Sequence, residues 1–288
     1  MQPEIVIQTL VSGLLMGFIF SLIAVGLNLI YGVMDIVNFA HGDFLMISMY
    51  TAFWLYTLGG IDPLFSLPIG AGLLFAIGWM TYKLLIRRVL KAPMLAQIFS
   101  TFGLMIFLRH AALMAFTSDY QAIGKSLVTG RIAIGGVFIP IPQLVASVGA
   151  IVTTGLIYWF IHRTEMGIAL MATAEDAEAA SLMGINSDRM YALAWGLGAA
   201  CVGVAGVLLA TFYYIFPEVG GFFGLLAYVI VALGGFGSIA GAFIAGLIVG
   251  VAEVLFGFVV APAFKYVFVY LIYLIVVIVR PQGLLGSR

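Results

Sequence analysis

The sequence has very few charged residues. They make up 8% of the 288 residues, whereas hydrophobic residues make up 64%, and the mean hydropathy is +1.21. A soluble domain is nearer half apolar and about a quarter charged. This composition excludes an ordinary soluble domain and indicates an all-α, polytopic membrane protein. The 12 basic and 12 acidic residues cancel, so bulk charge suggests no nucleic-acid partner.

Cysteines and catalytic motifs are equally scarce. The single cysteine, Cys201, lies in an apolar run, which excludes a disulfide framework and a thiolate metal site. The tripeptide Gly-Lys-Ser at 124–126 resembles the end of a phosphate-binding loop, but Asp119 stands where that loop needs a glycine. An intramembrane enzyme using His41 and Asp43 ranks low, because the chain has neither a metal-ligand pair such as HExxH nor a nucleophile elbow. We therefore expect no catalytic residue, metal or cofactor on this chain.

Nine apolar runs are candidates for membrane spans, because a spanning helix needs about 20 apolar residues. The first has no basic residue before it and is longer than a signal-peptide core, so we expect it to be retained. One later run is short and the second is interrupted by polar side chains, so either could be re-entrant. The sequence thus predicts one transmembrane domain, residues 1–288, with about eight to nine helices and at least one broken or re-entrant helix. The runs are 5–31, 37–58, 64–86, 95–116, 144–161, 190–216, 221–233, 239–260 and 264–279.

The placement of lysine and arginine predicts the orientation in the membrane. With nine crossings and the N-terminus outside, the cytoplasmic loops hold eight basic residues and the outside loops hold three. The polar stretch 163–189 is then cytoplasmic and the loop 117–143 is outside. If one weak run is re-entrant, the N-terminus moves inside while 163–189 can stay in place. The cytoplasmic set is Lys83, Arg87, Arg88, Lys91, Arg163, Arg189, Arg280 and Arg288, and the outside set is Lys125, Arg131 and Lys265.

The outside loop 117–143 carries its own signal for local structure. Two short stretches, 131–134 and 137–139, alternate around the pair Gly135-Gly136. Such alternation around a glycine turn predicts a small β-hairpin. The hairpin could receive a soluble binding protein, or it could be only a structured connection between spans.

The polar stretch 163–189, RTEMGIALMATAEDAEAASLMGINSDR, is predicted to contain a short helix over 173–183. Thr173 can serve as N-cap with Asp176 three residues later, and acidic residues near the start suit the helix dipole. Alanines favour the helix, and Gly184 stands where a glycine would end it. The helix could dock on a soluble partner, or the stretch could be a solvated loop. The residues that carry this prediction are Thr173, Glu175, Asp176, Glu178, Ala179, Ala180 and Gly184.

Polar residues also enter the membrane region at 31–43. An aspartate costs on the order of 2.5–3.5 kcal/mol in the middle of a span, so such groups must face protein or a watery path. Gly32 and Gly42 would allow an unwound backbone, whose N–H and C=O groups could hold the carboxylate and ammonium of a zwitterionic amino acid. The cluster could instead only pin a helix break or two subunits together. The candidates for the path are Asn38 and His41, followed by Asn28 and Asp43.

Glycine spacing and two further charges complete the membrane pattern. Three glycine pairs spaced four apart predict close helix packing rather than a flexible gate. Three glycines within 234–237 predict a turn or hinge instead. Arg109 and Glu253 lie at a shared depth of about 21 Å, so they could form a buried pair or make separate contacts. The packing pairs are Gly13 and Gly17, Gly237 and Gly241, and Gly246 and Gly250, and the hinge candidates are Gly42, Gly234, Gly235 and Gly237.

Four motifs resemble the permeases of ABC importers. Glu178-Ala179-Ala180, followed by Gly184, is similar to the EAA loop of that family, although the Ile-x-Leu-Pro that continues the general motif is absent and Met171 replaces an arginine of many members. The stretch 173–186 resembles the subfamily that imports branched-chain amino acids. Three more motifs resemble the same subfamily: Val37-Asn-Phe-Ala-His-Gly-Asp43, Leu233-Gly-Gly-Phe-Gly-Ser-Ile-Ala-Gly-Ala242 and Arg280-Pro-Gln-Gly-Leu-Leu-Gly286.

The resemblance implies an ABC-importer permease architecture in a bacterial inner membrane. It implies a cytoplasmic coupling helix at Glu178, a second homologous permease subunit, two ATP-binding subunits that carry ATP and Mg²⁺, and an extracytoplasmic substrate-binding protein. Branched-chain or other hydrophobic amino acids are the cargo it favours, and urea, short amides or aromatic acids are the alternatives within the family. An ion-coupled secondary transporter, which would work as a single chain, is the rival outside it.

Overall fold

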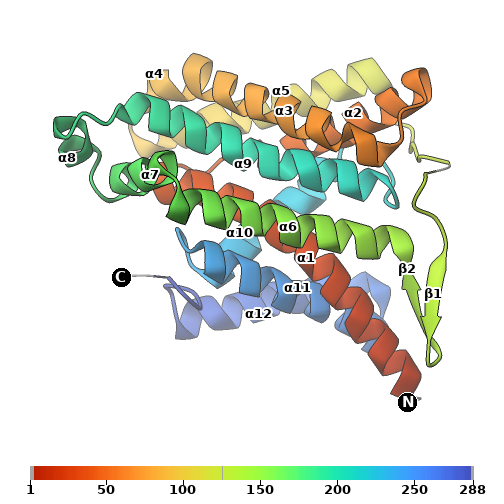
Figure 1. Ribbon diagram of the computed structural model, residues 1–288. Helices are drawn as coiled ribbons and strands as arrows, with labels where there is room; N and C mark the ends of the chain where they lie inside the picture. The colour runs from red at the N-terminus through yellow and green to blue at the C-terminus, as the bar shows by residue number, and fades with distance from the viewer. Residues whose placement is uncertain (1–2, 125, 287–288) are drawn as a thin grey trace.

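The computed structural model describes residues 3–124 and 126–286, and its helices lie side by side in one bundle (Figure 1). Two basic residues of the charge count lie outside the described residues: Lys125, which is also the lysine of the Gly-Lys-Ser tripeptide, and Arg288. The helices are α1 (Pro3–Met34), α2 (His41–Gly59), α3 (Pro63–Thr81), α4 (Arg87–Val89), α5 (Met94–Phe116), α6 (Ile141–Arg163), α7 (Glu165–Glu175), α8 (Ala177–Leu182), α9 (Ser187–Ala210), α10 (Val219–Gly234), α11 (Ile239–Val259) and α12 (Lys265–Val279). A π-helical turn η1 (Tyr82–Ile86), a 3-10 turn η2 (Pro262–Phe264) and two strands, β1 (Arg131–Ile134) and β2 (Val137–Pro140), complete the described elements.

Seven segments in the described part of the chain are long and apolar enough to cross a membrane. They comprise α1, α3 continued through α4, α5, α6, α9, α11, and η2 with α12. The all-α, polytopic prediction is therefore confirmed. Two predicted runs correspond to helices outside this set: α10, which has 16 residues, and α2, which has 19. These are the two runs that the sequence marked as candidates for re-entrant helices.

The connection between α1 and α2 lies inside the protein. Its residues 36, 38 and 40 are buried, and α2 begins where His41 Nε2 lies 3.0 Å from the carbonyl oxygen of Ile23, midway along α1. Irregular backbone at membrane depth is tolerated only where protein or water satisfies it. The backbone is thus irregular inside the bundle, but the break predicted at Gly42 is wrong. Gly32 and Gly42 are both helical, and the backbone leaves α1 at Asp35, which has a φ of 54°.

Gly42 is needed for a close approach rather than for a break. It lies in the first turn of α2 against Gly220 in the first turn of α10, and a Cβ on Gly220 would lie 2.5 Å from the carbonyl oxygen of Gly42. No side chain fits between the two backbones. The starts of two helices therefore meet inside the bundle.

The chain contains two copies of one arrangement, which the sequence did not predict. The two most extensive helix contacts are α1 with α11 and α3 with α9, and α2 packs on α9 as α10 packs on α1. This pattern pairs α1, α2 and α3 with α9, α10 and α11. Where α1 and α9 meet, a Cβ on Gly26 would strike the carbonyl oxygen of Gly198 at 2.6 Å, and a Cβ on Gly198 would strike that of Gly26 at 2.5 Å. Figure 1 shows α1 and α9 running in opposite directions, so the second copy is inverted relative to the first.

The glycine pairs on α1 and α11 hold these helices together as predicted. A Cβ on Gly13 would lie 2.8 Å from the Cα of Val251, and one on Gly17 would lie 2.9 Å from the Cα of Leu247. Gly246 and Gly250 line the opposing face. Small residues allow this approach, which van der Waals contact then stabilises.

The third glycine pair was wrong, because Gly237 lies in a turn and shares no helix face with Gly241. The predicted turn itself is confirmed: α10 ends at Gly234, and Gly235 and Gly237 have φ values of 103° and 81°. The motif 280–286 packs on this turn, with Leu284 N donating to Leu233 O at 2.8 Å. Two of the sequence motifs therefore form one structural unit.

The predicted hairpin is present, and it marks one end of the bundle. β1 and β2 pair antiparallel from Arg131↔Pro140 to Ile134↔Val137, with Gly135 and Gly136 at φ values of 56° and 84°. Gln8 of α1 exchanges two hydrogen bonds of 2.5 Å with the backbone of Phe138. The N-terminal end of α1 thus lies beside the hairpin, at the opposite end of the bundle from α8 (Figure 1). This separation is what the charge distribution requires.

Gly250→Leu should separate α1 from α11. Its side chain would have to enter the backbone of Gly17, so we expect a loss of about 3 kcal/mol of stability, or roughly 6–12 °C in the apparent melting temperature. Size-exclusion chromatography after heating measures this loss. Gly72→Leu on α3 is the control, because a Cβ there meets no atom within 4 Å. Equal melting temperatures for both variants would show that the glycine contact does not hold the bundle.

Candidate functional site

Asn28 holds the turn between α10 and α11. Its Nδ2 donates to Ser238 O at 2.7 Å and to Gly235 O at 3.2 Å, and its Oδ1 accepts from Gly237 N at 2.7 Å. The residue is buried, yet it also lines a cavity of about 330 Å³ between α1, α6 and α7. Its amide is therefore committed to the backbone of the turn.

Asn38 and His41 lie within the buried connection and the first turn of α2. Asn38 Oδ1 accepts from Ala40 N at 3.1 Å, and the hydroxyl of Tyr228 donates to Asn38 O at 2.7 Å. Asn38 Nδ2 and His41 Nδ1 are buried and have no partner among the described residues. Neither side chain lines a cavity described here. The side-chain contacts of both residues are with backbone atoms of α1 and of the connection before α2.

Asp43 is placed differently, because it pairs with Arg109 of α5 at the wall of a cavity. Arg109 Nε lies 3.2 Å from Asp43 Oδ1, and Nη2 lies 3.4 Å from Oδ2. The proposed pair of Arg109 with Glu253 is therefore wrong. Glu253 Oε1 binds Lys265 Nζ at 2.6 Å instead. Equal depth could not reveal this, since it carries no information on which helices are neighbours.

The cavity beside Asp43 has a volume of about 460 Å³ and lies between α2, α5 and α10. Phe39 forms part of its wall, with its ring 6.3 Å from that of Phe102 and 5.3 Å from that of Tyr228. The Asp43 carboxylate and the Arg109 guanidinium thus face a space whose other walls are mostly apolar. Its further lining residues include Met105, Glu218, Gly221, Phe222 and Leu225.

The predicted helix in 163–189 is two helices. Thr173 lies inside α7, buried, and its hydroxyl donates to Ala169 O at 2.8 Å, so the prediction that it caps the helix is wrong. The break comes at Asp176, whose carboxylate accepts from Glu178 N and Ala179 N at 2.9 Å each and caps α8. A carboxylate at that position satisfies two free N–H groups, which an interior threonine cannot do.

Helix α8 projects from the bundle and exposes an apolar tip. Leu182 is 87% exposed and Met183 is 83% exposed. Gly184 has a φ of 87° directly after them, as predicted for a helix-ending glycine. Among the remaining predicted residues of this stretch, Glu175, Glu178 and Ala179 are exposed and Ala180 is buried.

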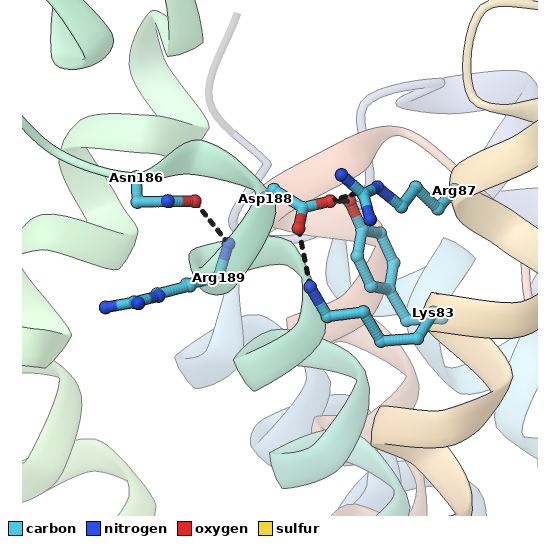
Figure 2. A network of polar contacts seen from close by, with 6 residues as sticks. Lys83, Arg87, Asn186, Asp188 and Arg189 are labelled. Atoms are coloured by element: carbon cyan, nitrogen blue, oxygen red, sulfur yellow. Dashed lines mark hydrogen bonds and ion pairs between the residues drawn. The ribbon is translucent and has the colours of Figure 1, made fainter.

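An ion-pair network fixes the start of α9 next to α8. Figure 2 shows Asp188 between Lys83 and Arg87, with Nζ of Lys83 at 2.5 Å and Nε of Arg87 at 2.9 Å from the carboxylate. Asn186 Oδ1 caps the same helix by accepting from Arg189 N at 3.0 Å. The pairing of Asp188 with Lys83 and Arg87 was not predicted from the sequence. The basic cluster at 83–91 was nevertheless a signal for an acidic partner.

The contact between Arg109 and Asp43 was also not predicted. A signal was available, because the two residues carry opposite charges and each lies in an otherwise apolar run. Among the described residues there is no group of three or more His, Cys, Asp or Glu side chains that could hold a metal ion.

Comparison with known proteins gives a consistent result over the whole chain. Residues 9–277 match the family model described as branched-chain amino acid transport system / permease component. The chain is 35% identical to the high-affinity branched-chain amino acid transport system permease protein LivH of Salmonella typhimurium, over 97% of this chain and 95% of that protein.

Two further relatives agree. The high-affinity branched-chain amino acid transport system permease protein BraD of Pseudomonas aeruginosa is 36% identical over 99% of this chain and 97% of its own length. A probable branched-chain amino acid transport permease protein LivH of Methanocaldococcus jannaschii is 30% identical over 92% of this chain and 88% of that protein. No solved structure matches the chain.

Asn28→Ala should destabilise the chain by loosening the turn at 235–238. It leaves the Gly237 N–H without its partner, so we expect a loss of about 2–3 kcal/mol, or roughly 4–12 °C in melting temperature. Thr51→Ala is the control, because the Thr51 hydroxyl bonds only Ile47 O of its own helix. If Asn28→Ala melts at the wild-type temperature but loses transport, Asn28 acts on a substrate path and does not stabilise the turn.

Proposed function

This chain belongs to the family of permease components of branched-chain amino acid transport systems, and from this premise we propose that it is the membrane subunit of an ABC-type importer in the inner membrane. Its cargo would be branched-chain or other hydrophobic amino acids. The relatives, which are named as branched-chain amino acid transport permeases, support this cargo. ATP would be hydrolysed by separate subunits, and a second related permease would complete the membrane part. The observation that carries the proposal is the exposed tip of α8 at one end of the bundle.

Helix α8 has the properties of a docking element. Large apolar side chains on a protruding tip expose contiguous apolar surface, which marks an interaction site. Leu182 and Met183 form this tip, and the acidic residues Glu175 and Glu178 lie on the exposed side nearby. We propose that each tip seats in an ATPase subunit, with Asp176 and Gly184 defining its two ends. Thr173 and Ala180 are buried, so they would support the element rather than touch the partner.

A movement of α8 would pass directly to α9. Ile185 N donates to Ala180 O at 3.1 Å, and the hydroxyl of Ser187 donates to Ala177 O at 3.1 Å, so hydrogen bonds join α8 to the connection before α9 and to its first residue. Asp188 then ties the start of α9 to Lys83 and Arg87 (Figure 2). A force applied at α8 therefore acts on the cytoplasmic ends of α3 and α9 together.

Helix α9 carries this movement to the re-entrant helix. It is among the most buried of the candidate spans and packs against α1, α2 and α3. The hydroxyl of Ser48 in α2 donates to Gly203 O of α9. Displacement of α9 would thus shift α2, and with it the wall of the cavity that contains Asp43.

The opposite end of the bundle offers a place for the substrate-binding protein. The hairpin β1–β2 is largely exposed and is fixed to α1 through Gln8. We propose that the loaded binding protein docks there. Helices α5 and α12 are the candidate spans least covered by the rest of the chain, so they leave apolar surface for lipid and for the second permease.

Replacing both tip residues, Leu182→Asp with Met183→Asp, should uncouple the importer. Both side chains are exposed, so the chain should insert normally, while charge at the tip should weaken ATPase docking. In liposomes containing the complete importer, we expect ATP-dependent leucine uptake to fall at least tenfold. Co-purification of the ATPase subunit should fall with it.

The matched control keeps the tip apolar with Leu182→Met and Met183→Leu, and it should retain uptake within about twofold because such swaps conserve volume. Normal uptake by the double aspartate variant would contradict docking at α8. Uptake by the chain alone, driven by an ion gradient, would contradict the ABC-type reading altogether.

A further inference from the structure

We propose that the cavity between α2, α5 and α10 holds the amino acid in transit by its two charges, with Arg109 taking its carboxylate and Asp43 and Glu218 taking its ammonium. This inference rests on the proposed function and names the residues that would recognise the cargo within the membrane. The sequence pointed to Asn38 and His41 for this role. The structure points instead to Asp43, the one predicted path residue that pairs with an opposite charge and also lines a cavity.

The ion pair is open on one side. Asp43 is only 1% exposed in its side chain, whereas Arg109 is 27% exposed. Arg109 uses Nε and Nη2 for Asp43, and within the described residues its Nη1 has no bond. A guanidinium offers five N–H donors in a fork that matches a carboxylate. Arg109 can therefore bind a second carboxylate without first releasing Asp43.

Helix geometry strengthens the preference for a carboxylate. The first turns of α2 and α10 meet at Gly42 and Gly220, and Gly220 also lines the cavity. A helix start favours negative charge, and broken helices in transporters use such ends to hold anionic groups of the substrate. Glu218 stands immediately before α10 and lines the same cavity, so it adds a second carboxylate that can accept from an ammonium.

The rest of the wall suits an aliphatic side chain. Phe102 and Met105 of α5 face the cavity together with Phe222 and Leu225 of α10. The volume of about 460 Å³ lies within the range of roughly 300–1,000 Å³ that small-molecule sites occupy. An amino acid with a polar side chain would bury that group against apolar atoms without a partner. The site therefore selects hydrophobic zwitterions.

A role in stability alone does not explain this pair. Replacing a buried ion pair by well-packed neutral groups is often neutral or stabilising, so a buried pair is weak evidence for a purely stabilising role. The chain offers a comparison in Glu253 and Lys265, a second partly buried ion pair that lines none of the cavities described here. Neutralising each pair in turn separates charge pairing as such from substrate handling.

The test uses the complete importer in liposomes and measures two quantities: labelled leucine uptake and ATP hydrolysis stimulated by the loaded binding protein. For Asp43→Asn with Arg109→Gln, we expect uptake to fall at least tenfold while stimulated hydrolysis stays within about twofold. Glu253→Gln with Lys265→Gln should keep uptake within about twofold. Wild-type uptake by the Asp43 and Arg109 variant would overturn the inference and leave the proposed function intact. A wild-type importer without ATP-dependent uptake would overturn the proposed function instead.

A second measurement needs no variant. It tests the inference even if the chain with Asp43→Asn and Arg109→Gln fails to assemble. Photo-activatable leucine is supplied to the wild-type importer during turnover, and the cross-linked peptides are identified by mass spectrometry. We expect labels within 102–109 of α5 and 218–228 of α10. Labels confined to segments that do not line this cavity would overturn the inference.

Discussion

The contact between the first turns of α2 and α10 is the constraint on which the rest of the structure depends. Gly42 and Gly220 bring two helix starts together inside the bundle, with no side chain between them. Each helix must therefore begin within the protein rather than at a membrane surface. The connection before α2 consequently has buried residues at 36, 38 and 40, where Asn38 accepts from Ala40 N and the hydroxyl of Tyr228 donates to Asn38 O. This arrangement leaves two positive helix ends beside a cavity in a chain that otherwise contains little charge.

The inverted arrangement explains how such a contact is supported from both sides. α1 and α9 cross at Gly26 and Gly198, and each then packs along a helix of the other half. Long helices thus brace the two shorter ones. Because α9 also receives α8 at its start, the same frame that holds the helix starts together connects them to the exposed tip at Leu182 and Met183.

Much of the fold could be predicted from the sequence, because lipid imposes strong local rules. Run length identified the candidate spans, and the short run at 221–233 and the polar run at 37–58 did become the two helices outside the set of candidate spans. The hairpin and the turn at 234–237 followed from glycine chemistry. Local patterns were sufficient wherever the cause was local.

The errors share a different cause, since they depend on which helices are neighbours. Equal depth allowed a pair between Arg109 and Glu253, whereas packing places α5 against α2 and brings Asp43 to Arg109. Thr173 was read as a cap because its neighbours could not show that α7 runs through it to Glu175. The inverted repeat was not predicted, because it is a pattern of contacts between helices and not a repeat of residues along the sequence.

The central claim is that force entering at α8 changes the cavity between α5 and α10. Spin labels at Met105→Cys and Leu225→Cys report on its width. The native Cys201 is buried, so labelling is done on the folded complex, where its thiol is shielded from the reagent. The distance between the labels is measured in the complete importer without nucleotide and with ATP trapped. The account predicts a shifted distance distribution on ATP binding, abolished when the apolar tip of α8 is removed. An unchanged distribution in an importer that transports normally would contradict it.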